Sequence, residues 1–234
     1  MPDNRPTLLF VHGAWHGSWC WDEVTTLLSD QGWRIRLIDL PTVHAAGKEL
    51  LGMQDDADAV AAAIDEIVGP VTVIAHSYGG VPTTQGATDP RVRHIVYIAA
   101  FALDEGESLL AAVGGEAPDW WHVNGPVVTA GDDDQPPQHL FYGDVDADVA
   151  DASAARLLPQ SVRAFTEPLT QVAWRDRPTT YILTEQDAIF PIPAQEALSA
   201  RAGSRVARLN ASHSPFLSQP DAVAEIIAAA ASGA

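Results

Sequence analysis

Ser77 stands in a sequence pattern that suits a nucleophile. A run of β-branched residues, Val71–Ala75, leads into His76-Ser77-Tyr78-Gly79-Gly80. Small residues flank the serine at Ala75 and Gly79, as a very tight turn between a strand and a helix requires. Such a turn raises the serine side chain out of the sheet, and the N-terminus of the next helix can stabilise a developing oxyanion. The pattern predicts that Ser77 attacks an acyl carbon, although ordinary strand-to-helix turns also contain serine.

A candidate base lies near the end of the chain. His213 follows the apolar run 206–209, which predicts the last strand, and sits in a loop of small residues. A histidine in this place can take the proton of Ser77 as it attacks and return it to the leaving group. We therefore predict that His213 is the general base.

Three carboxylates are candidates for orienting that histidine. Asp187 follows the predicted strand 180–184 and precedes apolar residues, which favours a buried carboxylate beside an imidazole. Glu185 is closer to the strand end and is expected to be exposed. Asp104 follows the fourth predicted strand and is a further alternative. We predict Asp187, which gives the chain order serine, acid, histidine.

A glycine-containing loop follows the first predicted strand, Leu8–Val11. It reads His12-Gly13-Ala14-Trp15-His16-Gly17. We expect the backbone N–H groups of Ala14 and Tyr78 to form the oxyanion hole, since backbone donors are fixed before the reaction starts. His12 and His16 are four residues apart, but they are not on a helix, so we predict no metal site and expect His12 to brace the loop.

Composition limits the classes of partner. Hydrophobic residues make up 47% of the 234 residues, which supplies one core, and the formal net charge of −18 repels nucleic acids and anionic membranes. The single cysteine, Cys20, allows no internal disulfide and is expected to be a packed thiol. The N-terminus lacks the pattern of a signal peptide and no apolar run spans a bilayer, so we expect a cytoplasmic protein. Whether it forms a homodimer is left open.

Strand and helix patterns alternate along most of the chain, which predicts an α/β fold with a mostly parallel sheet covered on both faces. The predicted strands and helices, beyond those already given, are Arg34–Asp39, Ile95–Ala99, Trp21–Ser29, Asp56–Val68, Pro193–Ala200 and Pro220–Ala231. The rhythm stops between Leu103 and Trp174. We interpret this segment as an inserted cap, helical around Val149–Leu158. The expected organisation is a core over 1–102 and 175–234 with the cap over 103–174.

These features together resemble the α/β-hydrolase superfamily over essentially the whole chain. The runs His12–Trp21, Ala75–Gly80 and His213–Ser218 are similar to motifs of one branch, which holds plant methyl esterases, hydroxynitrile lyases and related bacterial esterases. The resemblance implies an α/β-hydrolase fold and a cap that walls the substrate pocket. The candidate lining residues are Trp15, Trp120, Trp121, Phe141 and Tyr142. Ordinary packing of cap on core explains these aromatic residues equally well.

Two positions separate lyases from esterases in that branch. The lyases carry a threonine after the first histidine and a lysine after the catalytic histidine, whereas this chain has Gly13 and Ser214. The resemblance therefore implies a carboxylic-ester hydrolase acting on a small to medium, largely apolar ester, methyl ester or lactone, without a cofactor. Two alternatives stay open: a carbon–carbon bond lyase, hydrolase or tailoring enzyme with the same triad, and a non-enzymatic small-molecule receptor.

Overall fold

The protein is described by a computed structural model over residues 5–43 and 51–233. A six-stranded sheet with the order β2-β1-β3-β4-β8-β9 forms its centre, and each of these neighbouring pairs is parallel. The strands are β1 Thr7–Val11, β2 Ile35–Ile38, β3 Val71–His76, β4 Val92–Ile98, β8 Thr179–Thr184 and β9 Arg205–Leu209. The predicted α/β fold with a mostly parallel sheet is confirmed.

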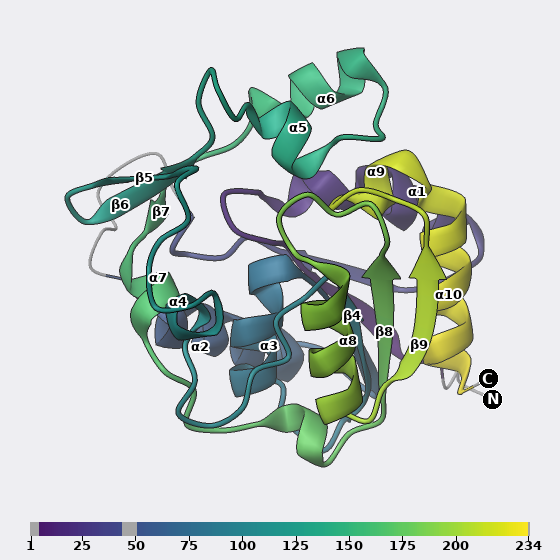
Figure 1. The fold of residues 1–234 in the computed structure, drawn as a ribbon. Coiled ribbons are helices and arrows are strands. Elements are labelled where there is room, and N and C mark those ends of the chain that lie inside the picture. The colour runs from purple at the N-terminus through teal and green to yellow at the C-terminus, as the bar shows by residue number, and fades with distance from the viewer. Residues whose placement is uncertain (1–4, 44–50, 234) are drawn as a thin grey trace.

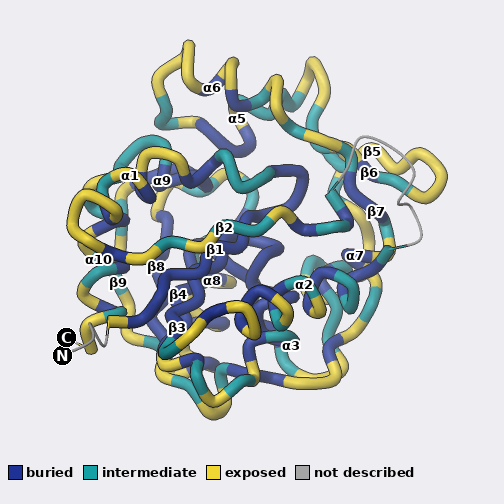
Figure 2. The backbone as a smooth tube through the Cα atoms, turned by 180° about the vertical axis from the view of Figure 1, so that it is seen from behind, coloured by how far each residue is buried: buried dark blue, intermediate teal, exposed yellow. Residues whose placement is uncertain are grey.

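Helices cover both faces of this sheet (Figure 1). They are α1 Asp22–Asp30, α2 Met53–Asp65, α3 Gly80–Gly86, α8 Ile192–Arg201 and α10 Pro220–Ser232. Side chains of β1 alternate between two buried clusters, because successive residues of a strand point to opposite faces. Leu8 and Phe10 pack with α1 and α10, while Leu9 and Val11 pack with α2 and α8. Figure 2 shows the buried strands at the centre of the molecule.

Helix α2 begins three residues earlier than predicted and ends three residues earlier. Asp55 accounts for the early start, because its carboxylate accepts a hydrogen bond from the Gly52 N–H at 2.7 Å, as in a capping box. The last helical residue, Asp65, lies four residues before the Gly69-Pro70 pair.

The segment 103–174, interpreted above as a cap, places α5 (Pro137–Phe141) and α6 (Ala147–Ala154) beyond the carboxyl ends of β8 and β9 (Figure 1). It contains a three-stranded antiparallel sheet, which the sequence analysis did not predict, and several short helices. Its elements are α4 Leu109–Ala112, β5 Trp121–Asn124, β6 Val127–Ala130, α5 Pro137–Phe141, α6 Ala147–Ala154, β7 Gln160–Ser161, α7 Arg163–Thr166 and the 3-10 turn η3 Ala173–Arg175.

The helix expected over Val149–Leu158 is shorter and shifted. Helix α6 ends at Ala154. The chain beyond it must leave the helix, because the Leu158 N–H donates to the Trp15 carbonyl at 2.9 Å and Gln160 joins the small sheet. No helix in the described residues is both long and apolar enough to cross a membrane.

Candidate active site

Ser77 begins a 3-10 turn, η2 Ser77–Gly79, directly after β3. Its φ angle of 50° lies in the left-handed region, which a residue with a side chain adopts only when its surroundings impose it. Gly79 explains the constraint, because a Cβ at that position would lie 2.4 Å from the His12 carbonyl oxygen. The turn after β3 therefore packs closely against the loop after β1, and this packing holds Ser77 out of the sheet.

His213 and Asp187 form a buried pair. The imidazole Nδ1 lies 2.7 Å from the Asp187 Oδ2, and the two side chains are 2% and 0% exposed. The carboxylate also accepts hydrogen bonds from the Thr184 hydroxyl and from the backbone N–H groups of Ile189 and Phe190. Since an ionised carboxylate only accepts, the Nδ1–H of His213 donates to it. The lone pair of Nε2 is then available to take a proton.

Ser77 and His213 line the same cavity. The hydrogen bonds of the described residues do not include one between the Ser77 hydroxyl and His213. Such catalytic hydrogen bonds are often long until substrate is bound. The arrangement therefore brings the Ser77 hydroxyl and the imidazole of His213 to one cavity wall.

The two alternative acids lie elsewhere. Glu185 forms an ion pair with Arg208 at 3.6 Å. Asp104 pairs with Arg175. Of the three carboxylates that the sequence offered, Asp187 is the one that contacts His213.

The loop after β1 is held by its two histidines. His12 donates from Nδ1 to the Gly13 carbonyl at 2.8 Å, and its Nε2 accepts from the Leu40 N–H at 2.9 Å. His16 donates from Nδ1 to the Ala14 carbonyl at 2.7 Å, and its Nε2 accepts from the Tyr142 hydroxyl at 2.8 Å. Burial lowers the pKa of His12 and lowers that of His16 to about 3, so both rings are neutral. Their ring nitrogens are all engaged within the protein.

Ala14 and Tyr78 also line the cavity, beside Ser77. Among the described residues, the Ala14 N–H has no hydrogen-bond partner. An N–H group without a partner at a cavity wall can donate to an oxygen of a bound molecule. This is the position that the sequence analysis assigned to an oxyanion donor.

The cavity has a volume of about 290 Å³ and an apolar, aromatic wall. Three of the five candidate lining residues, Trp15, Trp120 and Trp121, are part of this wall. The Trp15 ring lies 5.6 Å from each of the other two. In the described part of the chain, no Lys, Arg, Asp or Glu side chain lines the cavity. The other apolar lining residues are Phe101, Leu109, Ala112, Val113, Pro118, Phe165, Ala188, Ile189, Phe190, Pro191 and Ala194.

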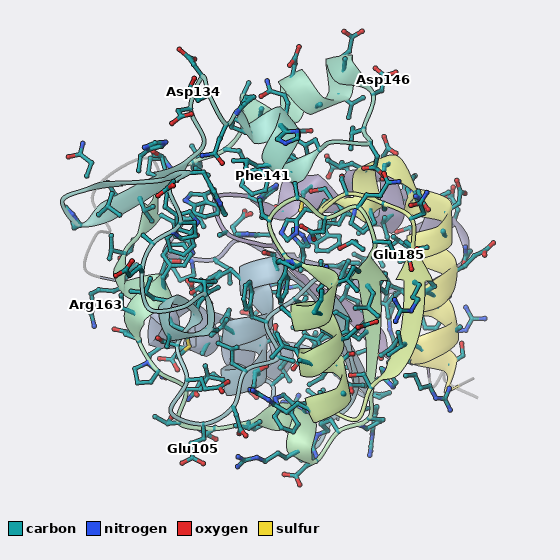
Figure 3. The ribbon with its side chains drawn as sticks, viewed as in Figure 1. Glu105, Asp134, Phe141, Asp146, Arg163 and Glu185 are labelled. Atoms are coloured by element: carbon teal, nitrogen blue, oxygen red, sulfur yellow. The ribbon has the colours of Figure 1, made fainter. Side chains whose placement is uncertain are left out.

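Phe141 and Tyr142, which were also expected to line the pocket, lie behind its wall. Phe141 packs against Trp15 at 5.9 Å and His213 at 6.1 Å, and Figure 3 shows it on the inner side of the cap. Tyr142 turns to His16 because its buried hydroxyl needs a hydrogen-bond partner.

Three phenylalanines of the wall were not singled out in the sequence. Phe101 and Phe190 stack at 4.4 Å, and Phe165 lies 4.6 Å from Trp121. They come from three separate segments, so no local spacing connects them. The one available signal was the position of Phe190 just after Asp187.

One family model covers most of the chain. Residues 8–226 match the model of the Alpha/beta hydrolase family. The chain belongs to this family. Relatives of this α/β-hydrolase include a carbendazim hydrolyzing esterase from Nocardioides sp., 27% identical over 94% of this chain and 98% of the other. They also include the pFDCC methylesterase of Arabidopsis thaliana, 28% identical over 81% and 80%.

Solved structures give the same fold. A pyrethroid hydrolase from Sphingobium faniae superposes on this α/β-hydrolase with a TM-score of 0.85 at 24% identity, covering 97% of each chain. The plant methyl esterases and bacterial esterases among the relatives agree with the branch that the three motifs indicated. These relatives are named as hydrolases and esterases, which supports a hydrolase.

Proposed function

We propose that the protein hydrolyses neutral carboxylic esters through an acyl-enzyme on Ser77, with His213 as base and Asp187 as the orienting acid. The observation that carries this proposal is the buried His213–Asp187 pair at 2.7 Å, in which His213 lines the same cavity as Ser77. The relatives named as esterases support the same class of reaction.

The proposed reaction has two halves. His213 Nε2 takes the Ser77 proton while the hydroxyl oxygen attacks the ester carbonyl, and Asp187 stabilises the imidazolium that forms. The N–H groups of Ala14 and Tyr78 stabilise the oxyanion. The alcohol leaves with the proton from His213, and water then attacks the acyl-enzyme with His213 as base again.

The proposed substrate is uncharged and carries an apolar or aromatic group. The cavity offers indole and phenyl rings and no cationic side chain from the described residues. Asp134 and Asp146 extend outward from the cap (Figure 3), and the whole chain has a net charge of −18. An anionic substrate would therefore approach against repulsion and find no counter-charge.

Within the lyase alternative, only the cyanide-releasing reaction is disfavoured, and it is disfavoured at two positions. A Cβ at position 13, where the lyases carry threonine, would lie 2.6 Å from the His76 Nδ1 and 3.1 Å from the Ser77 Cβ. Ser214 stands where they carry the lysine that holds departing cyanide, and it is fully buried. A receptor with a vestigial triad is the second alternative, and slow turnover with tight ligand binding would distinguish it.

The test compares the wild type with Ser77→Ala on a panel of neutral aryl and methyl esters, lactones and one cyanohydrin. Ser199→Ala is the matched control, because Ser199 is buried in α8 and bonds to the Glu196 carbonyl away from the cavity wall. We expect ester hydrolysis by the wild type and the control and none above background by Ser77→Ala. Equal activity in all three proteins would overturn the proposal.

A further inference from the structure

Asp56 is a fully buried carboxyl in helix α2 that the proposed reaction does not use. Its Oδ1 accepts a hydrogen bond from the Thr42 N–H at 3.0 Å. Its Oδ2 accepts from the Thr42 hydroxyl and from the Tyr78 hydroxyl, both at 2.6 Å. The side chain of Tyr78, the residue directly after the nucleophile, therefore ends on Asp56.

A second branch runs from Asp56 to the loop after β1. The Thr42 hydroxyl accepts from the Gln160 Nε2 at 2.9 Å. The Gln160 Oε1 accepts from the backbone N–H of Trp15 at 3.1 Å. Trp15 has a φ angle of 61°, so this contact helps to hold a strained residue directly after Ala14.

The two branches start at Asp56, and each ends at one of the two proposed oxyanion donors. One runs from Asp56 through the phenol of Tyr78, a residue that lines the cavity. The other runs through Thr42 and Gln160 to the peptide next to the Ala14 N–H. We infer that Asp56 is a positioning residue. Through buried hydrogen bonds it anchors the turn that carries Tyr78 and the loop that carries Ala14, and so fixes the spacing of the oxyanion hole. This inference rests on the proposed function.

The carboxyl group of Asp56 is suited to hold several segments together, because its oxygens can accept several hydrogen bonds. The two carboxyl oxygens of Asp56 accept all three hydrogen bonds, whereas an amide has one accepting oxygen and an NH₂ group that only donates. Burial raises the pKa of Asp56 to about 7 against the lowering effect of those bonds. Asp55 on the same helix adds to that rise. Glu167, which accepts from the Gln54 N–H, and the Tyr78 phenol are the other titratable groups near this cluster.

The experiment uses Asp56→Asn, Tyr78→Phe and the double variant. Tyr97→Phe is the matched control, because it also removes one buried tyrosine hydroxyl, bonded to Thr84 at 2.8 Å, away from the cavity wall. The readouts are kcat and KM on an aryl ester, the melting temperature, and the inhibition constant of an aryl trifluoromethyl ketone. The Ser77 oxygen adds to that ketone, His213 takes the proton, and the carbonyl electrons move to an oxygen in the oxyanion hole.

We expect Asp56→Asn to lower kcat/KM by about tenfold or more with KM nearly unchanged. The inhibition constant should rise by the same factor, because the ketone reports transition-state binding. Tyr78→Phe should show a smaller change in the same direction. The double variant should be no worse than Asp56→Asn, since the two residues act as one unit. Tyr97→Phe should lose stability and keep both kinetic constants.

The inference is overturned if Asp56→Asn and Tyr78→Phe keep kcat and the inhibition constant within twofold of Tyr97→Phe. If Asp56→Asn does not fold, Tyr78→Phe alone decides by the same criterion. If the wild type is active and the variants keep kcat and the inhibition constant, this inference is refuted and the proposed function is retained. An inactive wild type sinks both.

Discussion

The imidazole of His76 donates a hydrogen bond from Nε2 to the backbone carbonyl of His213 at 2.9 Å. The two rings are 4.7 Å apart, and His76 is completely buried. Burial lowers the pKa of His76, so the ring is neutral. The residue before the proposed nucleophile is thus joined directly to the proposed base, which lies on a loop from the far end of the chain.

Replacing His76 by phenylalanine should weaken that connection. The ring volume is kept, but the His213 carbonyl loses its donor, which costs about 1–3 kcal/mol of stability when a buried group is left unpaired. We also expect kcat to fall about tenfold with KM unchanged, because a misplaced base affects the chemical step. Steady-state kinetics and thermal unfolding measure both effects.

The matched control for His76 is His94→Phe. His94 is also buried and contacts the Thr180 hydroxyl at 2.8 Å, but it does not line the cavity. It should lose stability without losing kcat. Equal effects of the two substitutions on kcat would contradict a role of His76 in placing the base.

Asp187 and Asp104 offer a direct comparison of two acids. Asp187→Asn removes the acceptor that selects the tautomer of His213 and should lower kcat by about 10⁴-fold. Asp104→Asn breaks an ion pair with Arg175 at the surface and should change kcat less than twofold. Kinetics of both variants at one pH make the test, and a strong effect at Asp104 would mean that the acid is misassigned.

Trp121 should set the preference for aromatic esters. It lies 5.6 Å from Trp15 and 4.6 Å from Phe165 in the cavity wall. Trp121→Leu should raise KM for naphthyl esters about tenfold, from the loss of about 1.4 kcal/mol of aromatic contact, and leave a methyl acetate-sized ester unchanged. Trp33→Leu is the control, since Trp33 packs on the opposite face of the sheet. A parallel loss for both esters would argue against a role in specificity.

His16 should contribute to acid lability. Its pKa is lowered to about 3 by burial, so the folded chain holds it neutral while the unfolded chain protonates it below about 6.5. The stability that it contributes is therefore fully present above pH 6.5 and is lost as the pH falls towards 3, by at most about 1.4 kcal/mol per pH unit.

The variant His16→Gln should show a shallower decline of the free energy of unfolding between pH 6.5 and 4. Denaturant unfolding at several pH values measures the two slopes. Identical slopes in the wild type and the variant would show that His16 does not take up a proton on unfolding.

The inner strands of the central sheet, β1, β3, β4 and β8, could be predicted because each is a short, largely apolar and buried run with its own flanking signals. The run Val71–Ala75 and its small flanking residues indicated the elbow, and the position of His213 after the last strand indicated the base. These signals are local, since a strand buried on both faces requires apolar residues along its whole length.

The cap sheet carried one local signal that was missed. Strands β5 and β6 join at Gly125-Pro126, and Gly125 has a φ angle of 60°, as a type II′ turn requires at its first central residue. A glycine at the first central position is the sequence signal of this turn type. Strand β7 has only two residues, too few for any pattern.

The hydrogen bonds of Asp56 could not be predicted from sequence. Thr42, Tyr78 and Gln160 come from separate segments, and nothing in their spacing relates them. The same holds for the place of Phe141 behind the cavity wall. The hydrogen bonds of Asp56 follow from packing within the core, and the place of Phe141 follows from packing of the cap on the core.

The measurement that tests the account most directly is labelling by a fluorophosphonate, read by intact mass and by peptide mapping. The wild type should gain one adduct, located on Ser77, and lose esterase activity in proportion to labelling. Ser77→Ala should gain none, and Asp187→Asn should react far more slowly. An unlabelled wild type, or an adduct that persists in Ser77→Ala, would contradict the assignment of Ser77 as the nucleophile.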